Sequence, residues 1–368
     1  MRAIRLFLCG DVMTGRGIDQ ILPTPGNPRL HESVVHSAVE YVELAERRNG
    51  AIARPVSPVY IWGDALSELE RRHPDVRIVN LETAITTCDD AWPGKGIHYR
   101  MHPANVTCLG AAGVDCAALA NNHVLDWGRA GLEETVATLQ AAGIAVAGAG
   151  RNEQEAALPA ALAGPDGSRV LVFAFAMASA GTPSSWEATS RRPGVALLHD
   201  CSAASLGRLR DRIGAQRRGG DVVVVSIHWG PNWGYEVEPE RRRFARALID
   251  QAGVDVVHGH SSHHPIAVEL HAGRPILYGC GDFINDYEGI GGYEAYRPDL
   301  ALMVFVALDS AGGAAELRLV PLMRKRFRLG YAPPADLDWL QEVLSREGRA
   351  FGTHAARSDV HELRVWAD

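Results

Sequence analysis

The chain has 368 residues, of which 46% are hydrophobic and 22% are charged, and its formal net charge is −7 at pH 7. This composition is near the average of globular proteins and allows a large buried core. The acidic balance argues against a general nucleic-acid-binding protein, which usually presents a basic face. The one basic run, residues 324–328, is more typical of a solvated edge strand than of a binding site.

The six cysteines form no CxxC pair, and several lie within apolar runs. This pattern favours free thiols in a reducing compartment over a disulfide framework. The first residues are too short an apolar run for a secretory signal, and no stretch approaches the roughly 20 apolar residues that cross a bilayer. We therefore expect a cytoplasmic protein that does not bind membranes or nucleic acid, with its oligomeric state left open.

Apolar runs rich in Val, Ile, Leu and Phe predict buried strands. In chain order they lie at residues 3–9, 76–81, 115–120, 170–176, 222–227, 254–258, 275–279 and 301–307. Helical periodicity separates many of these runs. The clearest helical stretches are 33–48, 64–72, 129–142, 202–217 and 239–251. Alternating strands and helices are typical of a parallel sheet, so the first half of the chain is predicted to be α/β.

The last third of the chain favours antiparallel pairing, because turn residues separate its apolar runs. The two expected hairpins pair 266–270 with 275–279 and 301–307 with 315–321. A four-layer α/β/β/α sandwich accommodates both halves, and we expect residues 1–368 to form a single domain. Two long segments of weak periodicity, 22–58 and 178–194, are predicted either to cover a site or to be surface excursions.

Polar clusters follow five of the predicted strands. They are Gly10-Asp11, Asn80-Leu81-Glu82, Asn121-Asn122-His123, His228-Trp229-Gly230 and the run from Gly259 to His264. Functional groups of open α/β sheets gather at the carboxyl ends of strands, so these clusters are expected to meet. Asp, Glu, Asn and several His side chains in one place are typical of a metal site with acid/base groups beside it.

Each cluster also has a structural interpretation. Asp11 alone would more often be a helix cap, and His228 alone would more often be a hydrogen-bonded core residue. The three imidazoles of His260, His263 and His264 fall within five residues after a strand, a density that packing rarely requires. The five clusters together therefore favour an enzyme with a metal-centred site.

The order of these clusters resembles the calcineurin-like metallophosphoesterase superfamily, and more closely its CapA family, named for poly-γ-glutamate capsule biosynthesis. The resemblance extends from Gly10 to about Phe283 and includes the run from Tyr278 to Phe283. It implies the calcineurin-like four-layer α/β/β/α sandwich and a proton-transferring role for His123. It also implies that six residues hold or adjoin the metal, namely Asp11, Glu82, Asn122, His228, His260 and His263.

Three departures distinguish this chain from the dinuclear phosphoesterases that it resembles. Met13 stands where those enzymes have a histidine, Glu82 follows Asn-Leu where they have Gly-Asp, and Ser261-Ser262 lengthens the last His motif by one residue. A two-metal site depends on bridging and terminal ligands at these positions. We therefore expect one divalent cation, Ca²⁺, Mg²⁺ or Mn²⁺, held mainly by oxygen ligands.

A single cation with surplus imidazoles predicts a metal-dependent isomerase. The resemblance extends to a peptide epimerase of lasso-peptide maturation, which implies inversion at the Cα of a bulky C-terminal residue in a ribosomal peptide. The catalytic groups would be His123, His260, Asp11, Asp126 and Asp282. His123 would pair with Asp126 or Asp282, and His260 with Asp11. The alternatives are a metallophosphoesterase or a capsule biosynthesis protein of the CapA type.

A peptide substrate would need an apolar wall and a group that binds its terminal carboxylate. Trp229, Trp233 and Tyr235 directly follow a predicted site residue and are candidates for the wall, although ordinary packing explains them equally well. Arg16 or Arg100 is the candidate for a bidentate contact with the carboxylate.

Overall fold

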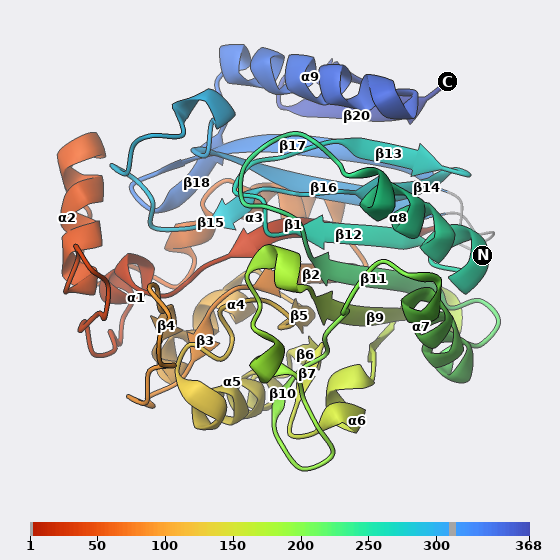
Figure 1. Cartoon of the computed structure of the whole chain (residues 1–368). Helices are drawn as coiled ribbons and strands as arrows, with labels where there is room; N and C mark the ends of the chain where they lie inside the picture. Colours follow the sequence, from red (N-terminus) through yellow and green to blue (C-terminus); the bar gives the residue numbers. More distant parts are fainter. Residues whose placement is uncertain (1–2, 309–313) are drawn as a thin grey trace.

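The computed structural model describes residues 3–308 and 314–368. Two β-sheets stack on one another, and helices cover their outer faces (Figure 1). Helices α7 (Ala203–Gln216) and α8 (Pro239–Ala252) lie side by side against the smaller sheet. Helix α3 (Ala65–Arg72) packs into the same apolar core as the larger sheet. The predicted four-layer α/β/β/α architecture is confirmed.

The larger sheet has the strand order β19-β20-β17-β16-β1-β2-β5-β6, with β15 beside β1 and β18 beside β17. Its first strands, β1, β2, β5 and β6, run parallel, whereas β16 and β17 and the final hairpin are antiparallel. The bounds are β1 (Ile4–Val12), β2 (Val76–Leu81), β5 (Cys116–Ala118), β6 (Ala145–Ala147), β15 (Asp282–Ile284), β16 (Leu300–Leu308), β17 (Ala314–Lys325), β18 (Arg328–Tyr331), β19 (Thr353–Asp359) and β20 (Glu362–Ala367).

The smaller sheet has the order β13-β14-β12-β11-β9-β8, in which β9, β11, β12 and β14 run parallel. Its strands are β8 (Ala160–Ala163), β9 (Arg169–Ala176), β11 (Val222–His228), β12 (Val256–His260), β13 (Val268–His271) and β14 (Arg274–Leu277). The antiparallel pairs β13/β14 and β16/β17 confirm both predicted hairpins. The turn expected at 310–313 lies outside the described residues.

Two minor ribbons pair β3 (Ala84–Ile85) with β4 (Arg100–Met101), and β7 (Ala149–Gly150) with β10 (Gly194–Val195). The remaining helices are α1 (Gly17–Ile21), α2 (Ala38–Asn49), α4 (Thr107–Ala111), α5 (Gly128–Ala141), α6 (Glu153–Ala157) and α9 (Pro334–Gly348). Short 3₁₀ turns occupy Tyr60–Trp62, Pro103–Val106, Pro165–Gly167, Ala178–Ala180, Ser184–Trp186, Glu294–Tyr296 and Arg349–Phe351.

Local sequence explains where the helices begin and end. Ser37 and Glu40 form a capping box at the start of α2, so the weakly periodic segment 22–58 contains a helix in its second half. Helix α8 starts with Pro239 in its first turn and ends at Gly253, whose φ of 68° suits glycine. Among the helices of the described residues, none is long and apolar enough to span a membrane.

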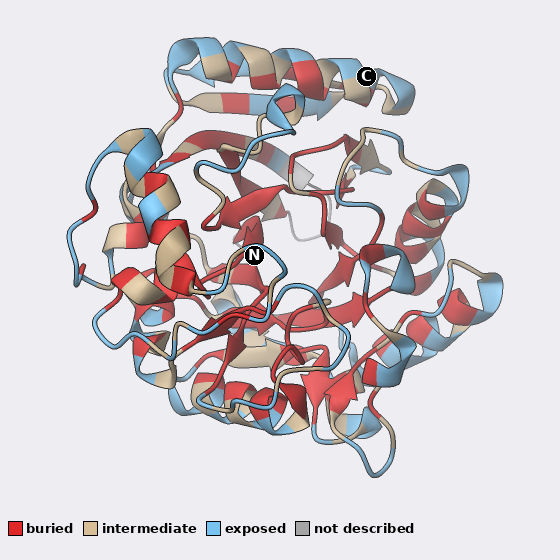
Figure 2. Ribbon diagram, turned by 60° about the vertical axis from the view of Figure 1, so that its left-hand side comes forward, coloured by how far each residue is buried: buried red, intermediate tan, exposed pale blue. Residues whose placement is uncertain are grey.

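Most strands are buried, with β8, β19 and β20 partly exposed, whereas the helices alternate between buried and exposed faces (Figure 2). Every residue of β11 is buried, because the other sheet covers one face of this strand and helices cover the other. This double covering explains the unbroken apolar run at 222–225. All six cysteines are free thiols, as their spacing predicts.

Candidate metal centre

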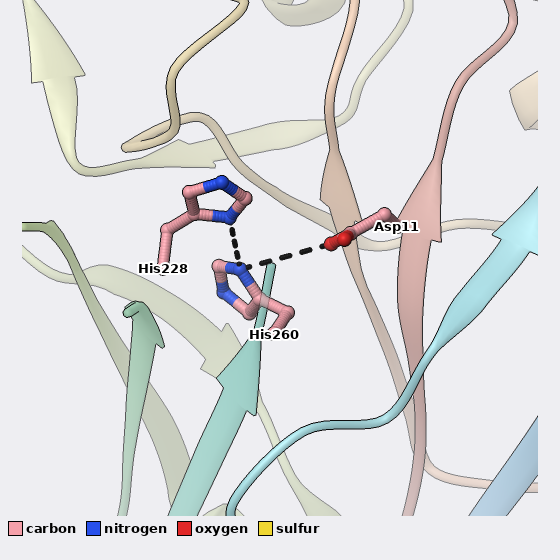
Figure 3. Close-up of side chains that lie close together, drawn as sticks. All are labelled: Asp11, His228 and His260. Atoms are coloured by element: carbon pink, nitrogen blue, oxygen red, sulfur yellow. Dashed lines mark hydrogen bonds and ion pairs between the residues drawn. The ribbon is translucent and has the colours of Figure 1, made fainter. Parts of the chain in front are cut away.

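Three buried side chains meet where the carboxyl ends of the two sheets converge (Figure 3). Asp11 lies near the end of β1, and His228 and His260 are directly paired final residues of β11 and β12. Nδ1 of His228 lies 2.8 Å from Nδ1 of His260, which lies 3.8 Å from Oδ1 of Asp11. One ligand atom from each residue falls within 4.8 Å of the other two, a spacing that one ion can bridge.

Glu82 and Asn122 extend this donor set. Oε1 of Glu82 lies 3.8 Å from Nε2 of His228, and Oδ1 of Asn122 lies 3.1 Å from the same nitrogen. The second carboxylate oxygen of Glu82 is buried without a hydrogen-bond partner among the described residues. An unpaired buried carboxylate oxygen is costly, and a cation beside it removes that cost. These residues therefore fit a divalent metal ion.

The electrostatics of the group agree with this fit. Burial, reinforced by the nearby charge of Asp282, raises the pKa of Asp11 to about 7. Burial also raises the pKa of Glu82 and lowers the pKa of both His228 and His260. The protein alone thus disfavours charge on each of these side chains. A divalent cation would stabilise both carboxylates in their ionised form and the imidazoles in their neutral form.

His123 stands beside this group with Asp126 as its orienting carboxylate. Nδ1 of His123 lies 2.7 Å from Oδ2 of Asp126, which also accepts a hydrogen bond of 2.6 Å from the backbone N–H of Tyr99. Nε2 of His123 lies 3.7 Å from Oε1 of Glu82. Burial lowers the pKa of His123 to about 4. Of the two carboxylates considered for His123, the fold places Asp126 beside it.

A second His–Asp pair is formed by His263 and Asp282, 2.9 Å apart. Asn285 donates to the other oxygen of Asp282 at 2.7 Å. Burial lowers the pKa of His263, but the negative charge of Asp282 outweighs burial and raises it. His263 lies outside the three-residue group in which the ligand atoms meet and is paired with Asp282, so its role as a metal ligand stays a prediction.

The predicted acid/base pair of His260 and Asp11 makes no hydrogen bond in this structure. Their closest atoms are 3.8 Å apart, which exceeds a hydrogen bond. His260 instead directs Nε2 toward Oγ of Ser226 at 2.8 Å. Asp11 accepts a 2.6 Å hydrogen bond from the side-chain amide of Asn80. These partners orient both side chains toward the metal position. In this arrangement His260 and Asp11 are too far apart to exchange a proton directly.

Neither arginine predicted to bind a substrate carboxylate is available for that role in this structure. The buried guanidinium of Arg16 donates to both oxygens of Asp286, at 3.1 and 2.5 Å, and to Glu32 at 2.9 Å. Arg100 contacts Asp89 at 2.6 Å and lies over the ring of Trp127. Sequence reasoning missed these carboxylates because they lie on distant or irregular segments.

The three predicted aromatic residues occupy different environments. Trp229 is buried in the core of the smaller sheet, where its Nε1 donates to the backbone oxygen of Tyr278. Trp233 lies 5.1 Å from the ring of His263 and stacks on Tyr293 at 3.9 Å. The ring of Tyr235 lies 4.7 Å from that of His264, the residue that follows His263. Trp233 is thus beside an imidazole of the site, whereas Trp229 packs in the core of the smaller sheet.

Several residues that sequence reasoning missed belong to this site. Nζ of Lys95 lies 2.5 Å from Oδ1 of Asp126, and the hydroxyls of Tyr99 and Tyr287 share a hydrogen bond of 2.5 Å. The ring of Tyr99 lies 4.4 Å from that of His123. Lys95 and Tyr99 lie on a segment without periodicity, so the composition Gly-Lys-Gly was the only available signal. Arg324, expected in a solvated run, is buried and donates to the backbone oxygen of Asp282.

Comparisons with known proteins identify the family. Residues 5–287 match the model of the bacterial capsule synthesis protein PGA_cap. The chain is 46% identical to a "Probable polyglutamine synthesis accessory protein" of Mycobacterium tuberculosis, over 98% of this chain and 96% of that protein. It is 28% identical to the "Capsule biosynthesis protein CapA" of Bacillus anthracis, over 87% of this chain and 67% of that protein.

Among solved structures, the 5'-nucleotidase precursor of Thermus thermophilus aligns over 95% of this chain and 59% of its own, with 15% identity and a TM-score of 0.46. The family match extends through the strand ends that supply Asp11, Glu82, His228 and His260. This chain therefore belongs to the bacterial capsule synthesis protein family PGA_cap.

Proposed function

We propose that this protein is a metal-dependent enzyme of glutamyl-polymer synthesis, acting on an amide-linked chain of glutamate or glutamine residues. The meeting of Asp11, His228 and His260 beside the unpartnered oxygen of Glu82 carries the proposal. The names of two relatives, one concerned with polyglutamine synthesis and one with capsule biosynthesis, support the polymer as substrate. They favour the capsule-type alternative over a lasso-peptide precursor.

The donor set combines two imidazoles with carboxylate and amide oxygens. Ca²⁺ and Mg²⁺ take oxygen ligands, whereas first-row transition metals include ions that also accept imidazole, and of the three predicted ions only Mn²⁺ belongs to that row. Mn²⁺ is therefore our choice among the three predicted ions. Bound at this position, it would polarise a carbonyl or carboxylate oxygen of the substrate.

The protein's own groups support proton transfer from two directions. With Nδ1–H of His123 donated to Asp126, Nε2 of that imidazole is a free proton acceptor facing Glu82. His263 and Asp282 form the second pair. His123 follows β5, and Asp282 begins β15, which lies on the opposite side of β1 from β2 and β5. Two oriented imidazoles flanking one position favour inversion at a Cα of the polymer as the reaction.

A phosphoesterase reaction is less well supported. The position at which dinuclear enzymes have a second metal-binding histidine is filled by Met13, which is buried and accepts a weak hydrogen bond from the hydroxyl of Tyr287 at 3.7 Å. A thioether is a poor ligand for hard cations. One polar site with two His–Asp pairs therefore suits acid/base chemistry better than a two-metal displacement.

Incubation of the purified protein with Mn²⁺ and glutamate or glutamine oligomers in D₂O tests the proposal. We expect deuterium at a Cα without a change in chain length, measured by mass spectrometry, and loss of the signal in His123→Ala. Shorter fragments would instead identify a hydrolase of the same polymer. Cleavage of a phosphodiester with no change in any oligomer would contradict the proposed function.

A further inference from the structure

Lys95 is one of only two lysines in a chain that otherwise uses arginine, and it lies beside the His123–Asp126 pair of the candidate metal centre. Its side chain is 16% exposed, and its charge acts on both Glu82 and His228. It is carried by the sequence Gly94-Lys95-Gly96, and a side chain added at either glycine would meet nothing within 4 Å. The loop tip therefore has open space around it on both sides of the lysine.

The ammonium group has donor capacity beyond its contacts in the protein. Nζ lies 2.5 Å from Oδ1 of Asp126 and 3.3 Å from the backbone oxygen of Ile97. It also lies 2.9 Å from Nδ1 of His123, but that nitrogen already faces Asp126 at 2.7 Å. A lysine ammonium carries three N–H donors, so one remains for an acceptor on a bound molecule.

The charges around the site determine which kind of group this donor can bind. Asp11, Glu82 and Asp282 surround the metal position and would repel a negatively charged substrate. Arg16 and Arg100 are held by carboxylates of the protein. Lys95 is also paired with a carboxylate, that of Asp126, but its side chain is 16% exposed, whereas those of Arg16 and Arg100 are 1% and 6% exposed.

The loop 178–194 lies beside Lys95. The centroid of the Trp186 ring, which is buried in the apolar core, lies 5.5 Å from Nζ of Lys95. Gly181 on the same loop lies against Asn122. The loop therefore adjoins both Lys95 and the donor set of the candidate metal centre.

We propose that Lys95 forms a subsite for a free carboxylate of the substrate chain, so that the enzyme selects a polymer of glutamate over one of glutamine. This inference rests on the proposed function, because it names which of the two polymers the site accepts. Lys95 would contact the carboxylate next to the residue that His123 reaches. A carboxamide at that position offers no charge to the ammonium and places an NH₂ group among donors.

Binding measurements on the full-length protein with Mn²⁺ test the subsite without requiring turnover. The two probes are a γ-linked glutamate hexamer and the same hexamer with every free carboxylate replaced by a carboxamide. We expect the wild type to bind the carboxylate form at least about tenfold more tightly, as measured by calorimetry, because hydrogen bonds between charged groups are the stronger ones. Lys95→Gln keeps a donor for Asp126 but removes the charge, and should abolish this preference.

Two further variants separate a specific role from a general loss of charge or of stability. Lys95→Arg should retain most of the preference, and Lys325→Gln, which removes the other lysine at an exposed position, should leave it unchanged. Thermal unfolding of Lys95→Gln checks that the variant is folded. If it is not, Lys95→Met, which also removes the charge, takes its place in the comparison.

The outcomes separate this inference from the proposed function. Equal binding of both hexamers by the wild type, or an undiminished preference in folded Lys95→Gln, would overturn the subsite and leave a glutamyl-polymer enzyme in place. Failure of the wild type to bind either hexamer would overturn both proposals together.

Discussion

Glu82 is the residue whose environment changes most if a cation is bound. One of its carboxylate oxygens is buried without a partner, and burial raises its pKa. We expect Glu82→Gln to weaken Mn²⁺ binding by about tenfold or more, because it replaces a negatively charged carboxylate beside the ion with a neutral carboxamide. Metal titration by calorimetry measures this effect, with exposed Glu43→Gln on α2 as the control. Unchanged affinity would remove Glu82 from the site.

In the proposed reaction, Asp126 acts through His123. Replacement by Asn removes the negative charge that holds Nδ1–H of His123 at 2.7 Å and favours the wrong tautomer of the imidazole. We expect Asp126→Asn to lower kcat by on the order of 10²-fold or more while the protein stays folded. Exposed Asp211→Asn on α7 is the matched control. Full turnover by Asp126→Asn would show that His123 needs no orienting carboxylate.

At the scale of elements, an ion-pair cluster joins α3 to the C-terminal hairpin. Arg72 lies 2.7 Å from Glu68 on its own helix and 2.5 Å from Glu362 on β20. Burial raises the pKa of both carboxyls, but hydrogen bonds from neighbouring groups, Arg72 among them, outweigh burial and lower it. Their stabilising effect is therefore complete above the ordinary glutamate range and is lost as the pH falls through and below it.

We expect Arg72→Met to lower the free energy of unfolding at pH 7 by about 1–3 kcal/mol, since it leaves two mostly buried carboxylates without their shared cation. The difference in free energy of unfolding between Arg72→Met and the wild type should shrink between pH 5 and pH 3, because the two carboxyls become protonated there. This interval extends from about one pH unit above to one below the ordinary pKa of glutamate. Denaturant unfolding at pH 7, pH 5 and pH 3 measures this difference in the free energy of unfolding. Arg71→Met, on a more exposed side chain, should cost less. A deficit that stays constant with pH would rule out the ion pair as its cause.

Sequence periodicity predicted the strands and helices that neighbouring layers bury and missed those at the exposed edge of the larger sheet. The apolar run of β11 and the helix of α8 are visible because burial on both faces, or along one stripe, leaves a strong pattern. Hairpin β19/β20 is half exposed, and its mixed composition gives a weak signal. The same reason hid Lys95, because the irregular segment 86–99 carries no period from which its position could be inferred.

The position of the metal centre in the whole molecule could be predicted, because parallel strands bring their carboxyl ends to one edge. Which side chains would face each other there could not. His263 follows β12 and Asp282 begins β15, and their pairing depends on β15 lying beside the end of β1. Likewise, nothing in the sequence shows that Arg16 folds back on Asp286, 270 residues away.

The metal centre also joins the two sheets, since Asp11 lies on the larger one and His228 and His260 lie on the smaller. An ion bound only by the folded state stabilises it by an amount that depends on its concentration, about 2.7 kcal/mol at 100 times the dissociation constant. We therefore expect Mn²⁺ to raise the melting temperature of the whole chain in one cooperative transition, and EDTA to reverse the shift. In Asp11→Asn the rise in melting temperature caused by Mn²⁺ should be less than half of that in the wild type, because the larger sheet then lacks its charged ligand. A melting temperature that does not respond to any divalent ion would contradict a metal centre at the junction of the sheets.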